Sequence, residues 1–205
     1  MHGIKAILFD LDGVLVNSNH LHYESFKEAV LTVAGVTIDQ NEHDALFNGV
    51  TTKQKLFYYI GKGHVDRCHG PHIERVKREK IIELIPNYIY PNEELKKLLT
   101  ELHTSYKFAL VSNSGKETSH LILQHLDIYH LFDLIVSPSD GLSPKPDPAM
   151  YIFARNSLGI LPSESLIFED SECGKAAAYQ SGCNVIEVKD PDDLLKKLTS
   201  LLALN

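Results

Sequence analysis

The sequence Ile7-Leu8-Phe9-Asp10-Leu11-Asp12-Gly13-Val14-Leu15 decides the fold of this chain. In it, an apolar run ends in two carboxylates, Asp10 and Asp12, with one residue between them and a glycine directly after them. Such a pattern is typical of a buried parallel strand that carries both carboxylates to its C-terminal end. Ligands bind outside that edge in open α/β sheets. We therefore expect a functional site at the end of this strand.

The two carboxylates favour a metal site. Because side chains alternate along a strand, Asp10 and Asp12 could face the same way while the chain stays extended. Two carboxylates so close repel each other unless they share a cation or a proton, and hard oxygen ligands suit Mg²⁺. The alternative interpretation is a strand that runs into an acidic turn, because Asp-Gly is a common turn pair.

The overall composition is that of an ordinary globular protein. The chain has 205 residues, enough for one large domain or for a core with a smaller inserted domain. Hydrophobic residues make up 43% of it and charged residues 23%, which is typical of soluble globular proteins. The formal net charge of −7 argues against an electrostatic nucleic-acid binder.

The cysteines and the apolar runs bear on the location of the protein. Cys68, Cys173 and Cys183 are too few and too scattered for a disulfide framework or a zinc site, and their odd number fits a reducing cytosol. The start of the chain, Met1-His2-Gly3-Ile4-Lys5, leaves no room for a signal peptide before the first strand, and no later apolar run approaches a membrane span. We therefore expect a cytoplasmic protein with no membrane partner.

Hydrophobic periodicity predicts helices and strands along the whole chain. The predicted strands occupy residues 4–9, 107–111, 134–136, 166–168 and 184–188. The predicted helices occupy a stretch from residue 17 to Gly35, and residues 42–47, 52–60, 73–85, 92–103, 116–126, 148–158, 174–181 and 191–202. Gly35 ends the first helix as a C′ glycine does, Thr51 or Thr52 could cap the third, and Pro86 and Pro91 interrupt the helical pattern.

This order of elements predicts an α/β protein with one helical insertion. Strands separated by helices of about ten residues indicate a parallel sheet with right-handed crossovers. We assign residues 1–16 and 87–205 to this core and residues 17–86, which contain no predicted strand, to the insertion. Because the insertion leaves directly after the Asp10 strand, it could fold over the site as a lid that excludes water. The alternative is a helical excursion packed on one face of the sheet.

Three further strand ends carry polar residues. Ser112-Asn113-Ser114-Gly115 follows one strand and could cradle an anion at a helix entrance, although this motif taken alone favours a simple Ser or Asn N-cap. Lys145 lies between prolines that fix the backbone around it and could aim its ammonium group; the alternative is a lone surface lysine. Glu169 and Asp170 end another apolar strand and could complete an oxygen-rich magnesium site.

Taken together, these motifs resemble a known family. Asp10-Leu11-Asp12-Gly13-Val14-Leu15, Ser112-Asn113, Lys145-Pro146-Asp147-Pro148 and Glu169-Asp170-Ser171 with Gly174 resemble, in order, the four motifs of the haloacid dehalogenase superfamily. The insertion resembles the cap of its subclass I, which includes β-phosphoglucomutase-like and phosphoglycolate-phosphatase-like enzymes. The resemblance implies a Rossmann-like, doubly wound parallel sheet with an inserted α-helical cap domain.

The resemblance also implies roles for the acidic residues. Asp10 would attack phosphorus to form an aspartyl phosphate that water then hydrolyses. Asp12 would protonate the leaving oxygen and then act as a base toward that water, and its carboxylate argues against dehalogenation, because that branch lacks an acid at this place. Mg²⁺ would be held by Asp10, the backbone carbonyl of Asp12 and Asp170. Glu169 would be either a metal ligand or an outer-shell partner.

The phosphate contacts implied by the resemblance come from the other two motifs. Ser112, the backbone of Asn113, and Lys145 would hold the transferring phosphoryl oxygens, because this chemistry depends mostly on positioning and charge neutralisation. We therefore expect a small phosphorylated metabolite as the partner, no nucleic acid, and a monomer or a weak homodimer.

Substrate choice is expected to come from the cap. His22 and Phe26 fall where β-phosphoglucomutase-like enzymes place a histidine and a tryptophan that face the site, and the loop Gly49-Val50-Thr51-Thr52-Lys53 resembles their specificity loop. The arginine with which the mutase holds a second phosphate falls near Thr52 here, so that phosphate would lose a bidentate partner. Lys53 or Lys77 could substitute as a point charge. For His22, a solvated position on a helix face is the alternative.

Three functions follow from these observations. The first is a magnesium-dependent phosphatase acting on a small phosphomonoester such as a sugar phosphate. The second is a hexose-phosphate mutase of the β-phosphoglucomutase type, which the missing arginine makes less favourable. The third is a non-catalytic, phosphate-responsive module similar to a receiver domain, which also combines an acidic cluster, a Ser or Thr and a Lys on a parallel sheet; the long insertion and Asp12 count against it.

Overall fold

A five-stranded parallel sheet forms the centre of the molecule. The computed structural model describes residues 3–203, and in it the strands lie in the order β3-β2-β1-β4-β5. The strands are β1 (Ala6–Phe9), β2 (Lys107–Val111), β3 (Leu134–Val136), β4 (Ser165–Glu169) and β5 (Asn184–Glu187). The chain runs outward from β1 on one side through β2 and β3, and on the other through β4 and β5. The predicted doubly wound α/β fold is confirmed.

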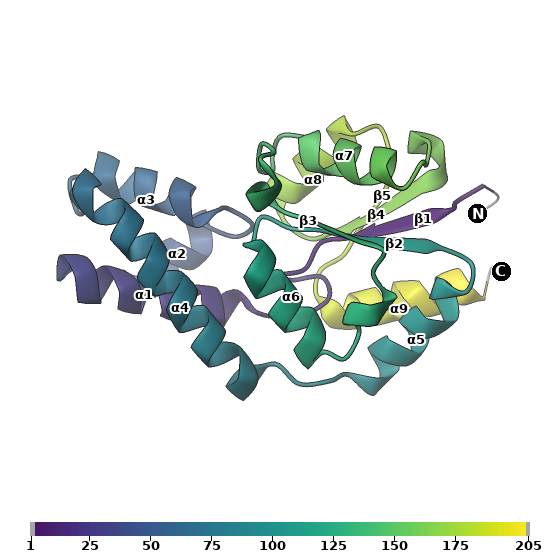
Figure 1. Cartoon of the computed structure of the whole chain (residues 1–205), viewed down its shortest axis with the longest axis horizontal. Helices are drawn as coiled ribbons and strands as arrows, with labels where there is room; N and C mark the ends of the chain where they lie inside the picture. The colour runs from purple at the N-terminus through teal and green to yellow at the C-terminus, as the bar shows by residue number, and fades with distance from the viewer. Residues whose placement is uncertain (1–2, 204–205) are drawn as a thin grey trace.

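Helices cover both faces of this sheet (Figure 1). On one face lie α5 (Glu93–His103), α6 (Lys116–His125) and α9 (Pro191–Leu202), and on the other α7 (Ala149–Ser157) and α8 (Glu172–Gln180). The side chains of β1 alternate between the two layers: Ile7 and Phe9 join the apolar core with α5, α6 and α9, whereas Ala6 and Leu8 join the core with α7 and α8. The apolar run of the first strand is therefore buried on both faces, as in other parallel sheets.

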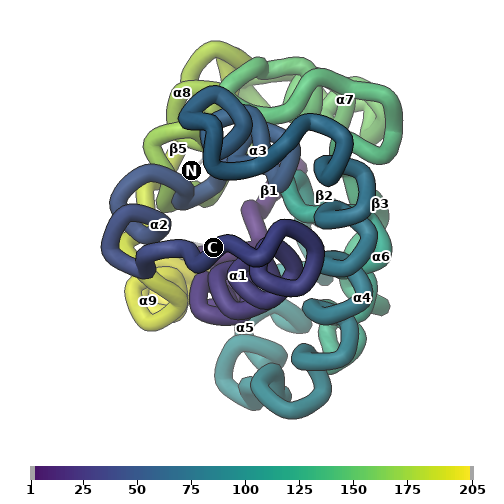
Figure 2. The backbone as a smooth tube through the Cα atoms, turned by 90° about the vertical axis from the view of Figure 1, so that its left-hand side faces the viewer, coloured from purple at the N-terminus to yellow at the C-terminus, as the bar shows by residue number. Residues whose placement is uncertain are grey.

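Residues 19–88 contain the helices of the predicted insertion. It consists of α1 (Asn19–Ala34), α2 (Gln40–Leu46), α3 (Thr52–Gly61) and α4 (Gly70–Tyr88). Figure 1 places these helices beyond one end of the strands, and Figure 2 shows them in front of the sheet when that side faces the reader. They enclose an apolar core of their own, which includes Tyr23, Phe26, Val30, Leu56, Tyr59 and Ile73. The insertion thus has a core of its own, while Leu21, Ile81 and Ile85 join the core of the sheet.

Local signals explain where these helices begin and end. The helix α1 ends at Gly35, whose φ of 68° suits glycine and whose N–H donates to the carbonyl of Leu31. Thr51, and not Thr52, caps α3: its side chain accepts from the N–H of Gln54, and the Gln54 side chain accepts from the N–H of Thr51. Both ends were predicted from the same residues.

One predicted helix end is wrong. Pro86 was expected to interrupt the helical pattern, but it lies inside α4, which continues to Tyr88. A proline within a helix removes one backbone hydrogen bond and crowds the preceding turn. Here it stands in the last turn, and the buried side chains of Ile81 and Ile85 hold α4 on the core of the sheet. The predicted boundary between residues 86 and 87 therefore falls within a helix.

Other differences from the predicted elements concern element ends and short additional helices. The strand predicted from residue 4 begins at Ala6, and four short 3₁₀ helices within residues 3–203, which were not predicted, are Arg67–His69, Tyr129–Leu131, Pro138–Asp140 and Pro162–Glu164. Residues 1, 2, 204 and 205, with which the predicted core begins and ends, lie outside the described residues. Among the described helices, none combines the length and the apolar character that a membrane crossing requires.

Candidate active site

The central cavity lies where the strand order reverses. Connections leave β1 and β4 toward opposite sides of the sheet, which is the place where open α/β sheets bind ligands. A cavity of about 480 Å³ opens there, a volume suited to a small metabolite. From the strand ends it is lined by Asp10, Asp12, Ser112, Asn113 and Lys145, and from the insertion by His22, His43, Thr51, Thr52, Lys55 and Lys77.

Lys145 joins two of the strand ends. Its Nζ lies 2.6 Å from Oδ1 of Asp10 and also donates to Oε1 of Glu169. All three side chains are buried, so Lys145 is not the surface lysine of the alternative interpretation. Although burial disfavours its charge, the carboxylates of Asp10 and Glu169 raise the pKa of Lys145 above its ordinary value. Lys145 is therefore a fixed positive charge beside Asp10.

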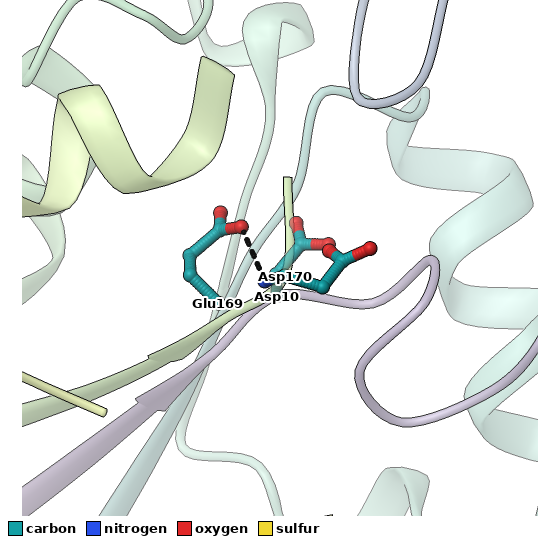
Figure 3. A group of neighbouring side chains, drawn as sticks. All are labelled: Asp10, Glu169 and Asp170. Carbon is teal, nitrogen blue, oxygen red and sulfur yellow. Dashed lines mark hydrogen bonds between the residues drawn. The ribbon is translucent and has the colours of Figure 1, made fainter. Parts of the chain in front are cut away.

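The acidic residues at the ends of β1 and β4 form a compact cluster. Asp10, Glu169 and Asp170 each offer one carboxylate oxygen, and the three oxygens lie within 4.8 Å of one another (Figure 3). Burial raises the pKa of Asp10 well above its usual range, with Glu169 and Asp170 adding to the effect and Lys145 opposing it. Burial and the charge of Glu169 likewise raise the pKa of Asp170 to about 6. The crowding of these carboxyl groups thus opposes the ionisation of Asp10 and Asp170 unless a cation joins them.

The donor set of this cluster fits a hard cation. Oδ1 of Asp170 is buried and has no hydrogen-bond partner among the described residues, an arrangement that costs free energy unless something else binds the oxygen. Carboxylate oxygens at this spacing are the ligands that Mg²⁺ prefers. The carboxylate of Asp12 lies outside the cluster. Only the backbone carbonyl of Asp12 could therefore bind a cation there, as the resemblance implies.

Glu169 is fully engaged by its neighbours. Its Oε1 accepts from Lys145 and, at 2.7 Å, from the hydroxyl of Tyr151. Its Oε2 accepts from the N–H of Asp170 at 3.1 Å, the bond drawn in Figure 3, and from the hydroxyl of Ser171 at 3.4 Å. Both oxygens thus have protein donors, and the residue holds Lys145 and Asp170 in position.

Gly174 in α8 packs directly on Glu169, and its replacement gives a first prediction. A Cβ at Gly174 would lie 2.0 Å from Oε1 of Glu169, and this carboxylate cannot move without losing its bonds. We expect Gly174→Ala to lower the free energy of unfolding by about 1–3 kcal/mol, as other overpacked sites do. Thermal unfolding measures this. Gly61→Ala, in open space at the end of α3, is the matched control and should be neutral or stabilising; equal melting temperatures for the two variants would contradict the prediction.

Asp12 faces a different set of partners. It accepts hydrogen bonds from the hydroxyl of Ser18, from Nε2 of His22 at 2.9 Å and from the hydroxyl of Ser114 at 2.6 Å. Although burial favours the neutral acid, His22, Ser114 and Ser18 hold the pKa of Asp12 well below its usual range. These donors thus stabilise the ionised form of Asp12.

His22 is half-buried, with a side chain that is 15% exposed, and it connects Asp12 to the insertion. Nζ of Lys77 lies 3.1 Å from its Nδ1, so Nδ1 accepts from the ammonium group and the ring proton stands on Nε2, toward Asp12. Burial lowers the pKa of His22, as does the charge of Lys77, against the opposing effect of Asp12. The solvated position considered for His22 is therefore wrong: the residue lies between the two halves of the site.

Asn113 ties the strand ends to the insertion. Its Oδ1 accepts from the N–H of Lys145 at 2.9 Å, and its Nδ2 donates to the carbonyls of Lys145 at 3.1 Å and Gly49 at 2.7 Å. The hydroxyl of Ser112 is buried and accepts from the N–H of Ser114 at 3.0 Å. The residue that precedes α6 is Gly115, so neither Ser112 nor Asn113 is a simple helix cap.

The residues predicted to select the substrate divide into two groups. His22, Thr51, Thr52 and Lys77 line the cavity. Phe26 and Lys53 do not belong to the described residues that line the cavity. Phe26 is buried in the core of the insertion, and Lys53 is exposed on α3. A helix turns by about 100° per residue, and this places Lys53 on the outer side of α3.

Sequence reasoning missed several residues of the cavity wall, among them His43 and Lys55. The missed signal is helical spacing: in α3, Lys55 is buried together with Leu56 and Tyr59, at the i, i+1 and i+4 positions that share one face of a helix. A lysine within the apolar stripe of a helix is a candidate functional residue, because a buried ammonium group needs a partner.

This chain is similar to known proteins both in sequence and in structure. The family model described as haloacid dehalogenase-like hydrolase matches residues 7–188. The pyrophosphatase PpaX of Bacillus velezensis is 26% identical, with 97% of this chain and 95% of that protein covered. The fructose-1-phosphate phosphatase YqaB of Escherichia coli is 26% identical, with 90% and 96% covered. The structure of β-phosphoglucomutase from Clostridium difficile shares the fold, with a TM-score of 0.80, 21% identity, and 98% and 100% covered.

Proposed function

Because this chain belongs to the haloacid dehalogenase-like hydrolases, as a member of subclass I of that superfamily, we propose that it is a magnesium-dependent phosphatase. Its substrate class is a small phosphomonoester, with sugar phosphates favoured. One observation carries the proposal: Asp10, with Lys145 at 2.6 Å, lies in the same buried cluster as the unpartnered oxygen of Asp170. A nucleophile, a positive charge and a cation site thus meet at the floor of one cavity.

The first half of the proposed reaction takes place at Asp10. One of its carboxylate oxygens attacks phosphorus, the bond from phosphorus to the ester oxygen breaks, and an aspartyl phosphate forms. Asp10, Asp170 and the backbone carbonyl of Asp12 would hold Mg²⁺, which would supply charge neutralisation for the approach of a carboxylate to a phosphate. Glu169, whose oxygens already accept hydrogen bonds from four groups, is proposed to position Lys145 and Asp170.

The proton transfers are assigned to Asp12. In its protonated form it gives a proton to the leaving oxygen. As a carboxylate it then takes a proton from the water that attacks the aspartyl phosphate, which releases phosphate, restores Asp10 and regenerates the acid. The three hydrogen bonds that Asp12 accepts in this structure favour its ionised form, which is the base of the second step; the first step uses the protonated form that the second step regenerates. His22 is proposed to orient it.

Three groups are proposed to hold the transferred phosphoryl group. Ser112 and the backbone of Asn113 lie at the end of β2, and Lys145 lies opposite them. Asn113 fixes the backbone of Lys145 through two hydrogen bonds, so the ammonium group has little freedom. Such preorganised donors stabilise the charge on the equatorial oxygens of the transition state.

We propose that residues 17–86 act as a cap over a core of residues 1–16 and 87–205. The placement of α1 to α4 beyond the ends of the strands and their separate apolar core support this division. The hydrogen bond of 2.7 Å from Asn113 to the carbonyl of Gly49 joins the two parts, with the cavity between them. In this arrangement the cap excludes water from the aspartyl phosphate until the leaving group departs.

The wall of the cavity favours phosphatase over mutase. Thr52 lines it at the place where the resemblance implies an arginine in the mutase, and a hydroxyl cannot grip a phosphate as a guanidinium does. The relatives described above include two named for phosphate hydrolysis and one named as a mutase, and their names favour catalysis over a receiver-like module.

Removal of the metal tests the proposal. We expect the purified protein to hydrolyse p-nitrophenyl phosphate and at least one sugar phosphate in the presence of Mg²⁺, and to lose at least about 100-fold in rate when EDTA is present, because the carboxylates then repel the phosphate. Phosphate release measured by colorimetry gives the rate, and added Mg²⁺ should restore it. Turnover that is insensitive to EDTA would contradict the metal site, and no turnover of any phosphomonoester would contradict the function.

A further inference from the structure

The side of the cavity that the insertion provides contains two buried lysines. Each helix of the insertion contributes at least one basic side chain to the cavity lining, among them His22 from α1, His43 from α2, Lys55 from α3 and Lys77 from α4. Lys55 and Lys77 are both buried, with exposed fractions of 4% and 9%. The proposed reaction at Asp10 uses Lys145 and leaves Lys55 without a role.

Lys55 has a neutral partner. Its Nζ lies 2.9 Å from Nε2 of His43, and because an ammonium group can only donate, this nitrogen accepts and the ring proton stands on Nδ1. Nδ1 of His43 lies 3.4 Å from Oδ1 of Asp44. Burial and the charge of Lys55 lower the pKa of His43 to about 4. His43 is therefore uncharged at neutral pH and does not compensate the charge of Lys55.

Lys77 has a similar arrangement on the next helix. Its Nζ donates to His22, which donates to Asp12. Within residues 3–203, neither Lys55 nor Lys77 forms an ion pair with a carboxylate, whereas Lys145 forms two. Two lysines are thus buried at one cavity wall with imidazole rings as their partners in place of carboxylates.

This arrangement is electrostatically incomplete. Burial, together with the positive charge of Lys77, lowers the pKa of Lys55 to about 7, and burial lowers the pKa of Lys77 to about 8. A buried ammonium group is costly unless an anion accompanies it. An anionic group that enters the cavity between the two lysines would supply the missing charge. Asp44, the insertion's own carboxylate on this wall, has a side chain that is 55% exposed and accepts from His43, so it does not fill that place.

We propose that Lys55 and Lys77 form a second anion site, which binds a carboxylate or phosphate group at the end of the substrate remote from the phosphate that Asp10 attacks. The inference rests on the proposed function, since it names the class of phosphomonoester: one with a second anionic group. Lys55 is the specificity-determining residue of this site. Phe26 and Phe47, whose ring centroids lie 5.7 and 6.0 Å from Nζ of Lys55, keep that ammonium group at the cavity wall.

The site is tested with substrates that differ only in their remote end. Glucose 6-phosphate and glycerol 3-phosphate end in hydroxyl groups, 6-phosphogluconate and 3-phosphoglycerate in a carboxylate, and glucose 1,6-bisphosphate in a phosphate. We expect the wild-type kcat/KM to be about 10-fold or more higher for the substrates with an anionic end of suitable length. A gain with the acids alone identifies a carboxylate site, and a gain with the bisphosphate alone identifies a phosphate site.

Replacement of Lys55 makes the test specific. Lys55→Met should lower kcat/KM for the preferred anionic substrate by about 10- to 100-fold, mainly through KM, and change that for its hydroxyl-ended counterpart by less than about threefold. Lys53→Met is the matched control, because Lys53 lies on the same helix but is exposed and outside the described cavity lining; it should leave the preference intact. If Lys55→Met does not fold, Lys55→Gln, which keeps a donor toward His43 without the charge, replaces it.

The outcomes separate this site from the proposed function. Turnover without a preference for anionic ends, or a preference that survives in both Lys55 variants, would overturn the second anion site and leave the phosphatase intact. If no phosphomonoester is hydrolysed, calorimetry measures the binding of the same compounds to the protein with Mg²⁺ and decides whether the second anion site exists. Tighter binding of the anionic-ended compounds that Lys55→Met weakens would support the site alone, and equal binding of all compounds would overturn it.

Discussion

Asp10→Asn is expected to abolish turnover of phosphomonoesters. The amide has nearly the shape of the carboxylate, and its oxygen can still accept the hydrogen bond that Lys145 now donates to Oδ1 at 2.6 Å. It is, however, a poor nucleophile and carries no charge for a metal ion. Removal of a nucleophile costs at least about 10⁴-fold in kcat. Single-turnover experiments should show no phosphorylated protein.

The control for Asp10→Asn is the same substitution at a surface position. Asp66 is exposed and its side chain caps no helix, so Asp66→Asn should keep the wild-type rate. Circular dichroism should show both variants folded. Turnover by Asp10→Asn within about tenfold of the wild-type rate would exclude Asp10 as the nucleophile, since such a residual rate is far above what other groups in an active site supply alone.

Asp12→Asn is expected to slow both halves of the reaction, by about 10²- to 10⁴-fold in kcat. Without a proton donor the leaving oxygen departs as an alkoxide, and without a base the water attacks the aspartyl phosphate unaided. Three donors, from Ser18, His22 and Ser114, now point at this carboxylate, and an amide has only one oxygen to receive them. A loss of about 1–3 kcal/mol in the free energy of unfolding should accompany the substitution.

The two roles of Asp12 can be measured separately. Rapid mixing with an aryl phosphate, whose leaving group needs little protonation, isolates the breakdown of the aspartyl phosphate. Acid quenching should then trap more phosphorylated protein in Asp12→Asn than in the wild type. Breakdown at the wild-type rate would remove the proposed role as a base, while slow formation with alkyl phosphates alone would leave Asp12 only the role of an acid.

The strand ends of the site could be predicted because each is a local pattern. The run from Ile7 to Phe9 is apolar at every position, and a carboxylate follows it; only a strand buried on both faces accounts for such a run. The same reasoning placed Ser112, and the pair Glu169 and Asp170, at neighbouring strand ends. Parallel strands bring their carboxyl ends to one edge, so these residues had to converge.

The helical insertion was less predictable in its details. The spacing of apolar residues predicts the helices of the insertion, but it does not predict which polar residue of each helix faces the cavity. Phe26 was expected to face the site and packs within the insertion. Of the two lysines considered as a point charge, Lys77 lines the cavity and Lys53 does not, whereas Lys55, which was not considered, does. Two residues along a helix correspond to a rotation of about 200°, so a small uncertainty in how α3 is oriented moves a lysine from the cavity to the outer surface.

The sequence by itself determined the α/β fold, the acidic pair at the end of the first strand and the position of the insertion, because periodicity and strand ends are properties of neighbouring residues. Only the tertiary structure decided the pairing of Lys145 with Asp10, which are 135 residues apart, the contact of His22 with Asp12, and the burial of Lys55 beside His43. These contacts depend on how the insertion lies against the sheet, and packing of separate elements sets that geometry. The acidic pair thus became two distinct groups: Asp10 lies with Lys145 and the metal-ligand cluster, and Asp12 with the histidine of the insertion.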